Sequence, residues 1–255
     1  MSVLLTRRLE NADPMFIAWS SYPAAGMPAR MARAGVDAVV VDMQHGMHSE
    51  SSVLREPPEI LATGKPPILR IPVGRNDLAS RGLDAGYEAV IAPMINSVDD
   101  AQAFVAAMKY PPLGERSWGP AQALKLNPDH TMGSYFKSAN GETLAIAMIE
   151  TMRAVDVYED ILALDGIDGL FIGPSDLSIS WSGGKTVNPD LPEMQDFLAQ
   201  LAGKCAAAGK LSAVYATSVE AVVRARDMGF RMITATNDDL LIRTGADSIL
   251  NRVRV

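Results

Sequence analysis

Two carboxylates, Glu150 and Asp176, stand at or just beyond the ends of two apolar runs, Leu144–Ile149 and Gly169–Gly173. Burying an unpaired charge costs on the order of several kcal/mol in desolvation, so acids in these positions indicate a site rather than packing. Two carboxylates offer hard oxygen ligands and leave positions for water and substrate. This suits Mg²⁺, Mn²⁺ or Co²⁺ better than a closed zinc site. The pair therefore predicts an exchangeable divalent metal.

Asp42 and Arg70 each directly follow another β-rich apolar run. His45 lies three residues after Asp42, so the carboxylate can orient the imidazole ring and raise its basicity, as a general base requires near neutral pH. Arg70 can offer two parallel donors to a carboxylate or an enolate oxygen. A salt bridge from Arg70 to Asp42 or Glu150 is the structural alternative, and both roles can hold at once.

The segment Gly173-Pro174-Ser175-Asp176 predicts the first turn of a short helix, where proline is favoured. Free backbone N–H groups near Ser175 and Asp176 can then bind a carboxylate. Tyr215 ends a further apolar run, and we expect its side chain at the same rim, where it narrows the space beside the metal. A tyrosine that only packs is the other interpretation.

These residues require a scaffold that brings strand ends together. Short β-rich runs alternate with helical patterns along the chain, which is typical of a parallel sheet with helical crossovers. The sequence predicts a (β/α)8 TIM barrel formed by residues 1–255 as one domain, with the active site at the carboxyl ends of the strands. The predicted strands are Phe16–Trp19, Ala38–Val41, Pro67–Leu69, Ala89–Ala92, Leu144–Ile149, Gly169–Ile172, Leu211–Tyr215 and Met232–Ala235.

Composition narrows the class of function. The 255 residues carry a net charge of −7 and no basic block, so a nucleic-acid partner is not expected. No apolar run approaches a membrane span, and the apolar stretch at the N-terminus is too short for a signal peptide, which predicts a cytoplasmic protein. The single cysteine, Cys205, has the helical spacing of a core residue.

The segment Lys109–Asn140 is much longer than an ordinary connection in such a barrel. Lying before the fifth predicted strand, it can fold over the barrel mouth with Arg116 and Trp118 facing a ligand. A packed surface excursion is the alternative, and the sequence leaves both open.

Two absences restrict the chemistry. No lysine stands at a predicted strand end, so Schiff-base chemistry is not expected. After the seventh and eighth strands, where barrels often bind phosphate, the chain has Ala216-Thr217-Ser218 and Asn237-Asp238-Asp239 in place of a glycine loop. The substrate is therefore expected to lack a phosphate group.

The motifs together resemble the class II pyruvate-dependent aldolases of the hydroxy-ketoacid type, which include 4-hydroxy-2-oxoheptanedioate and 2-keto-3-deoxy sugar acid aldolases. The similarity runs in order through nearly the whole chain. It is carried by Asp42-Met43-Gln44-His45, Arg70 with Asn76-Asp77, Ala92-Pro93-Met94, Tyr110-Pro111-Pro112-x-Gly114-x-Arg116, Ile149-Glu150-Thr151 and the run Gly169 to Leu177.

The resemblance implies a role for each site residue. Glu150 and Asp176 would bind the divalent metal that chelates pyruvate, and Arg70 would stabilise the enolate oxygen. The His45 and Asp42 pair would handle protons. The amides at Ser175 and Asp176, with Gly173 and Pro174 beside them, would hold the pyruvate carboxylate. Independently of the resemblance, the position of Tyr215 at the rim predicts a preference for small or hydroxylated aldehydes.

The chain departs from the family pattern at two positions. Many members have glutamine where this chain has Met148 and glutamate where it has Gln44, and both changes bear on metal and acceptor preference. The resemblance also implies a phosphoenolpyruvate/pyruvate type of barrel and a homohexamer built from helix-swapped dimers. Leu240–Val255 would be the exchanged helix.

We therefore expect the protein to be a metal-dependent aldolase that uses pyruvate or hydroxypyruvate and an aldehyde. Two alternatives stay open at this point. One is an oxaloacetate decarboxylase or acyl-CoA lyase on the same barrel, because decarboxylation passes through the same enolate. The other is a barrel that binds small oxo acids without turnover.

Overall fold

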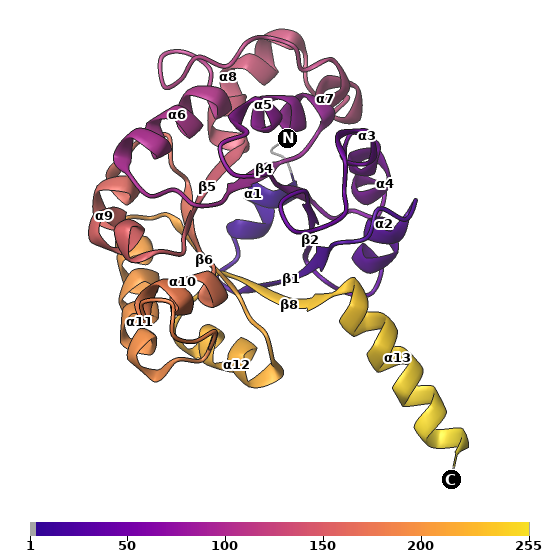
Figure 1. Cartoon of the computed structure of the whole chain (residues 1–255). Coiled ribbons are helices and arrows are strands. Elements are labelled where there is room, and N and C mark those ends of the chain that lie inside the picture. Colours follow the sequence, from indigo (N-terminus) through magenta and orange to yellow (C-terminus); the bar gives the residue numbers. More distant parts are fainter. Residues whose placement is uncertain (1–3, 255) are drawn as a thin grey trace.

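The computed structural model describes residues 4–254 and is a closed barrel of eight parallel strands, each followed by at least one helix (Figure 1). The (β/α)8 prediction and all eight predicted strands are confirmed. The strands are β1 Met15–Ser20, β2 Ala38–Asp42, β3 Pro67–Arg70, β4 Ala89–Ala92, β5 Leu144–Ile149, β6 Gly169–Ile172, β7 Leu211–Tyr215 and β8 Met232–Asn237. The helices are α1 Leu4–Leu9, α2 Met27–Ala32, α3 Glu50–Val53, α4 Glu56–Leu61, α5 Asn76–Ala85, α6 Val98–Met108, α7 Ala121–Leu126, α8 Met132–Glu142, α9 Met152–Ala163, α10 Pro174–Trp181, α11 Pro192–Ala207, α12 Val219–Asp227 and α13 Asp238–Val253.

The strands are apolar on both faces because both faces are buried. In β5, Leu144, Ile146 and Met148 belong to the cluster that fills the barrel, and the residues between them pack against the helices. Side chains alternate between the two faces of a strand. Continuing this alternation by one step turns Glu150 toward the barrel interior, at its carboxyl end.

Parallel pairing brings the strand ends to one rim. Asp42, the last residue of β2, is in register with Arg70, the last residue of β3. Their side chains therefore point into the same end of the barrel at neighbouring positions. The two residues can therefore be in direct contact although they are far apart in the sequence.

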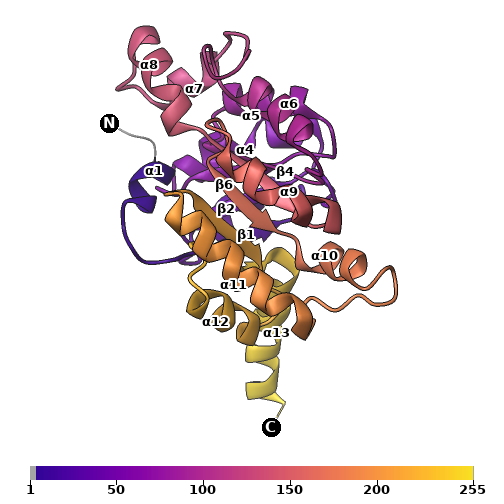
Figure 2. The same ribbon diagram turned by 90° about the vertical axis from the view of Figure 1, so that its left-hand side faces the viewer.

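The amino end of the barrel is covered by α1. Leu5 is fully buried with the interior residues Met15 and Ile17. The carboxylate of Glu88, just before β4, accepts hydrogen bonds from the backbone N–H groups of Leu5 at 2.6 Å and Leu4 at 3.3 Å. Burial raises the pKa of Glu88 to about 7. Figure 2 shows α1 and α10 at opposite ends of the barrel.

The last helix, α13, projects away from the barrel (Figures 1 and 2). Only its first residue, Asp238, is buried, and the carboxylate of Asp238 accepts from the backbone N–H groups of Ser21 and Tyr22 at 2.7 and 2.8 Å. Beyond this attachment Ile242, Ile249 and other apolar side chains face outward. The helix is therefore held to its own barrel only at its root.

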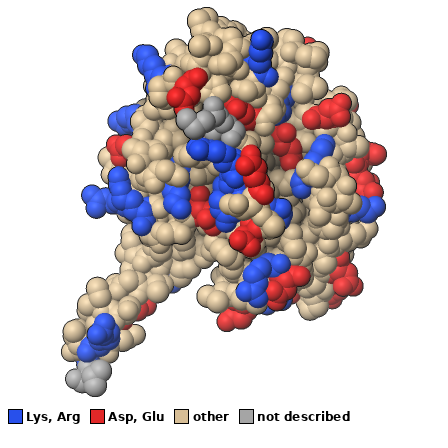
Figure 3. Space-filling model, turned by 180° about the vertical axis from the view of Figure 1, so that it is seen from behind, with Lys and Arg blue, Asp and Glu red and all other residues tan. Residues whose placement is uncertain are grey.

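Charge is mixed over the surface. Basic and acidic side chains alternate on the face seen in Figure 3, without an area of one sign. Within residues 4–254, no helix has the length and apolar character needed to cross a membrane.

Candidate active site

The strand alternation places several side chains around a cavity of about 250 Å³ at the carboxyl rim of the barrel. They come from the ends of β1, β2, β3, β5, β6 and β7, and helix α10 closes one side. The cavity is lined by Trp19, Ser21, Asp42, His45, Arg70, Met148, Glu150, Phe171, Gly173, Pro174, Ser175, Asp176 and Tyr215. The nine residues predicted at the strand ends and at the start of the short helix therefore lie at this one cavity, namely Asp42, His45, Arg70, Glu150, Gly173, Pro174, Ser175, Asp176 and Tyr215.

Arg70 and Asp42 form a buried, two-pronged ion pair. Nε and Nη2 of Arg70 donate to Oδ1 and Oδ2 of Asp42 at 2.8 and 2.6 Å. The guanidinium carbon lies 4.7 Å from the centre of the Trp19 ring, whose Nε1 donates to Asp42 Oδ2 at 3.2 Å. This planar arrangement fixes Arg70 in one orientation. Within residues 4–254, Nη1 of Arg70 donates no hydrogen bond to another residue, so this nitrogen is free to donate to a ligand in the cavity.

The same contacts correct the role predicted for Asp42. Although burial raises its pKa, Arg70, the N–H of Gln44 and Trp19 together hold the pKa of Asp42 below the usual value. Further backbone N–H groups, of His45 and Gly46, also point at its two oxygens. A carboxylate occupied in this way does not orient the His45 ring. That ring is exposed at the cavity mouth, and no hydrogen bond to it is recorded within residues 4–254.

Glu150 is buried beside the arginine pair. Its Oε1 accepts from the backbone N–H of Met94 at 2.7 Å, and Met94 adopts a positive φ of 54°, an uncommon conformation that aims this N–H inward. Burial raises the pKa of Glu150 to about 7. The Met94 bond opposes this shift, and the nearby charge of Asp176 adds to it. A second carboxylate close enough to disfavour the charged form of Glu150 makes this a natural place for a cation.

Glycine is required at position 173 by the close approach of Glu150. A Cβ on Gly173 would lie 2.3 Å from Glu150 Oε2 and 3.1 Å from the Cε atom of Met148. No hydrogen bond to Oε2 is recorded among residues 4–254, so this oxygen is available to a ligand. The donor set therefore fits a hard divalent cation with two protein carboxylates. Within residues 4–254, no group of three or more His, Cys, Asp and Glu residues is arranged to hold a metal ion, at this cavity or at any other place.

Helix α10 begins as the sequence predicted, with Gly173 at its N-cap and Pro174 in its first turn. The first recorded backbone bond of the helix is from the N–H of Leu177 to the carbonyl of Gly173, and it leaves the N–H groups of Ser175 and Asp176 unpaired in the described chain. Asp176 itself is exposed toward the cavity. A helix amino terminus with unpaired N–H donors thus lies beside the two acids.

Three residues of the site were not predicted from the sequence. Trp19 packs edge-on against Tyr215, with ring centres 5.2 Å apart, and forms the wall behind Arg70. Trp19 follows Met15 and Ile17 at every second position of β1, and this spacing could have indicated that its side chain points into the barrel. Met94 contributes only a backbone N–H, and Asn237, which donates to the Tyr215 hydroxyl at 3.3 Å, lies on β8. Neither contact has a signature in the local sequence.

The segment Lys109–Asn140 lies at the opposite rim, so the prediction that Arg116 and Trp118 face a ligand at the barrel mouth is wrong. Lys109 Nζ donates to Thr143, just before β5, at 2.6 Å, and to Asp168, just before β6, at 2.7 Å. Both partners mark the amino ends of strands.

Arg116 and Trp118 pack within this segment instead. Arg116 binds Asp84 at 2.7 Å and lies 4.6 Å from the Tyr110 ring, and Trp118 contacts the rings of Tyr110 and Phe136. The alternative left open by the sequence, a packed surface excursion, is confirmed.

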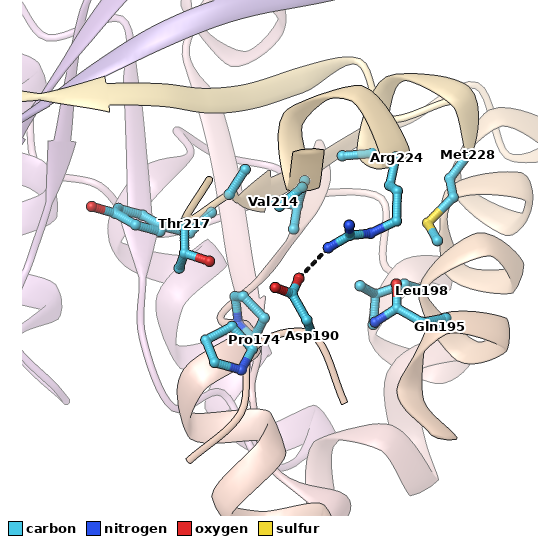
Figure 4. A pocket seen from close by; sticks show the side chains of 13 residues that line it. Pro174, Asp190, Gln195, Leu198, Val214, Thr217, Arg224 and Met228 are labelled. Carbon is cyan, nitrogen blue, oxygen red and sulfur yellow. Dashed lines mark hydrogen bonds and ion pairs between the residues drawn. The ribbon is translucent and has the colours of Figure 1, made fainter. Parts of the chain in front are cut away.

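Two other hollows lack the chemistry of the rim cavity. The one in Figure 4, between α11 and α12, holds only about 20 Å³ and is spanned by the Asp190–Arg224 ion pair. Such a volume accommodates little more than one water molecule. A larger one, of about 520 Å³, lies at the amino rim beside Asp168 and Lys210, away from both predicted metal ligands.

Comparison with known proteins adds to this geometry. The sequence profile of the HpcH/HpaI aldolase/citrate lyase family matches residues 15–249. The chain belongs to the HpcH/HpaI aldolase/citrate lyase family. A family member from Burkholderia cenocepacia J2315 has a crystal structure that superposes with a TM-score of 0.86, at 27% identity and over 100% of both chains.

Relatives with named activities can be aligned with nearly the whole of this chain. A hydroxypyruvate/pyruvate aldolase of Rhizorhabdus wittichii is 32% identical over 242 residues, or 94% of this chain and 94% of that protein. A 2-keto-3-deoxy-L-rhamnonate aldolase of Escherichia coli O157:H7 is 28% identical over 98% of this chain and 94% of that protein. The chain is accordingly an enzyme of the carbon–carbon lyase class, and the resemblance inferred from its motifs is confirmed.

Proposed function

We propose that the protein is a divalent-metal-dependent class II aldolase. It cleaves 4-hydroxy-2-oxo acids to pyruvate or hydroxypyruvate and an aldehyde, and forms the same bond in reverse. The supporting observation is one cavity that combines two carboxylates with available oxygens, an arginine with a free donor and a helix amino terminus. Residues 1–255 act as a single catalytic domain.

Glu150 and Asp176 hold the metal in this proposal. When bound, a divalent cation such as Mg²⁺, Mn²⁺ or Co²⁺ supplies a fixed positive charge that polarises the substrate carbonyl. The unpaired N–H groups of Ser175 and Asp176 bind the carboxylate of the oxo acid. These contacts orient the 2-oxo group toward Arg70.

Arg70 donates from Nη1 to the oxygen on which negative charge develops as the carbon–carbon bond breaks. Because its other edge is clamped by Asp42 and backed by Trp19, this donor is preorganised and needs no rearrangement during the reaction. The electron pair of the broken bond stays on the pyruvate fragment as an enolate, and the other fragment leaves as an aldehyde.

His45, at the cavity mouth, moves the protons. It removes the proton from the 4-hydroxyl group as the aldehyde forms and returns a proton to the enolate carbon. The same base, acting alone on pyruvate, removes a methyl proton. Tyr215, across the cavity, lies on the side from which the aldehyde enters in the synthetic direction.

Proton exchange on pyruvate tests this function without knowledge of the aldehyde. In D₂O with Mn²⁺ and pyruvate, the protein is expected to introduce deuterium into the methyl group, as measured by mass spectrometry against an enzyme-free sample. Chelation should abolish the exchange. A protein that only binds oxo acids would give none at all. Unchanged exchange after chelation, or trapping of pyruvate on the protein by borohydride, would contradict the metal mechanism.

We also propose that α13 packs against a second copy of the chain, in a homo-oligomer that the family resemblance makes a hexamer. Its side chains of Ile242, Ile249 and Val253 are 56%, 65% and 71% exposed, which an isolated protein rarely tolerates on one free helix. Replacing Ile242 and Ile249 by Lys is expected to lower the mass measured by analytical ultracentrifugation. A wild-type protein that sediments as a monomer would rule this assembly out.

A further inference from the structure

Asn237 connects the root of α13 to the active site through its side chain. It is the last residue of β8 and the N-cap of α13. Its Oδ1 accepts from the backbone N–H of Leu240 at 2.8 Å, and its Nδ2 donates to the Tyr215 hydroxyl at 3.3 Å. A backbone N–H can only donate, so the amide oxygen must face Leu240. The amide NH₂ group therefore must face Tyr215.

This orientation determines what the Tyr215 hydroxyl can do. A phenolic hydroxyl has one hydrogen to donate and can also accept. Because the oxygen of Tyr215 accepts from Asn237, its hydrogen is left for another partner. Within residues 4–254, Asn237 is the sole recorded hydrogen-bond partner of this hydroxyl.

The Tyr215 side chain is also held in place from its other side. Its ring meets the Trp19 ring edge-on, with centres 5.2 Å apart at an angle of 79°. Tyr215 lines the rim cavity that holds Glu150 and Asp176. The ring is thus fixed by Trp19, and the polarity of its hydroxyl is fixed by Asn237.

We propose that Asn237 is a specificity-determining positioning residue that keeps Tyr215 a hydrogen-bond donor toward the acceptor aldehyde. Aldehydes that carry a hydroxyl group near the carbonyl present an oxygen to this donor and are preferred over unsubstituted aldehydes of equal size. The inference rests on the aldolase function proposed above and goes beyond it by naming what selects the acceptor.

Asn237→Asp gives a direct test. Aspartate keeps the oxygen that caps α13, and Asp is among the favoured N-cap residues, so the helix root is retained. A carboxylate has no hydrogen to donate and instead accepts the phenolic hydrogen. Tyr215 then has only lone pairs to offer to the acceptor.

The measured quantity is the ratio of kcat/KM for glycolaldehyde to kcat/KM for propanal, with pyruvate and Mn²⁺. The two aldehydes have the same number of heavy atoms and no charge, so a change in the electric field of the site affects both alike. We expect the ratio to fall about fivefold, the range of one net hydrogen bond. Tyr215→Phe should lower it to the same extent, and the double variant should lower it no further.

Ser218→Ala is the matched control. Ser218 caps the adjacent helix α12 by accepting from the N–H of Ala221 at 3.1 Å, and it does not line the cavity. Losing this cap should leave the ratio at its wild-type value. An unchanged ratio in Asn237→Asp, or effects of Asn237→Asp and Tyr215→Phe that multiply in the double variant, would overturn the inference. Absence of pyruvate proton exchange in the wild-type protein would instead overturn the proposed function.

Discussion

Glu150→Gln is expected to abolish the response of aldol cleavage to Mn²⁺ and to lower turnover by about a thousandfold or more. The proposal gives the metal two protein carboxylates, Glu150 and Asp176, so one neutral amide removes half of the negative charge that these ligands supply. The change is nearly isosteric, and the amide oxygen can still accept from the N–H of Met94. The loss should therefore appear as weakened Mn²⁺ binding in calorimetry together with loss of cleavage.

Glu88→Gln is the matched control for this experiment. Burial raises the pKa of both glutamates to about 7, and each accepts a backbone hydrogen bond, but Glu88 lies at the amino rim. The control should keep the Mn²⁺ response and turnover. The Glu150→Gln variant should unfold at no lower temperature than the wild type, because a charge that was costly to bury has been removed. Retained Mn²⁺ binding in that variant would place the metal elsewhere.

Arg70→Lys is expected to lower kcat by about a hundredfold while Mn²⁺ binding persists, the effect of losing one preorganised donor. Lysine keeps the charge but cannot hold both oxygens of Asp42, lie flat on Trp19 and donate into the cavity at once. Steady-state kinetics at saturating Mn²⁺ would measure the loss.

Arg116→Lys provides the corresponding control at the opposite rim. Arg116 is also a buried arginine that binds an aspartate, Asp84, and lies over an aromatic ring. Any loss of stability caused by shortening such a side chain should appear in both variants, but the fall in kcat should appear only in Arg70→Lys. Near-normal turnover in Arg70→Lys would make Arg70 a structural ion pair.

The barrel was predictable because each strand is a short apolar run flanked by helical patterns. The gathering of Glu150, Arg70 and Asp42 followed from that alone, since parallel strands end at one rim. The salt bridge from Arg70 to Asp42, which the sequence left open, is confirmed, whereas the expected contact of Asp42 with the His45 ring rested on proximity in sequence alone. Strand register instead brings Arg70, 28 residues away, opposite Asp42.

The position of the segment Lys109–Asn140 could have been predicted from the order of helices and strands along the sequence. A connection from a strand to a helix lies at the carboxyl rim, and one from a helix to a strand lies at the amino rim. Because α6 (Val98–Met108) precedes the segment, it had to emerge at the amino rim. The contacts of Asn237 and Met94 were beyond sequence reasoning, because each joins residues that only the closed barrel brings together.

The Glu88 carboxyl group, which holds helix α1 at the amino end of the barrel, makes the stability of the fold depend on pH. The pKa of the Glu88 carboxyl is about 7 in the folded chain, against an ordinary value of 4.5. Between these values the folded chain keeps a proton that the unfolded chain has released, so folding takes up a proton. The contribution of Glu88 to the free energy of unfolding is thus greatest below about pH 4.5 and is lost as the pH rises to about 7. Mild acidification therefore relieves the cost of burying this carboxyl group, although its hydrogen bonds from Leu4 and Leu5 favour the charged form.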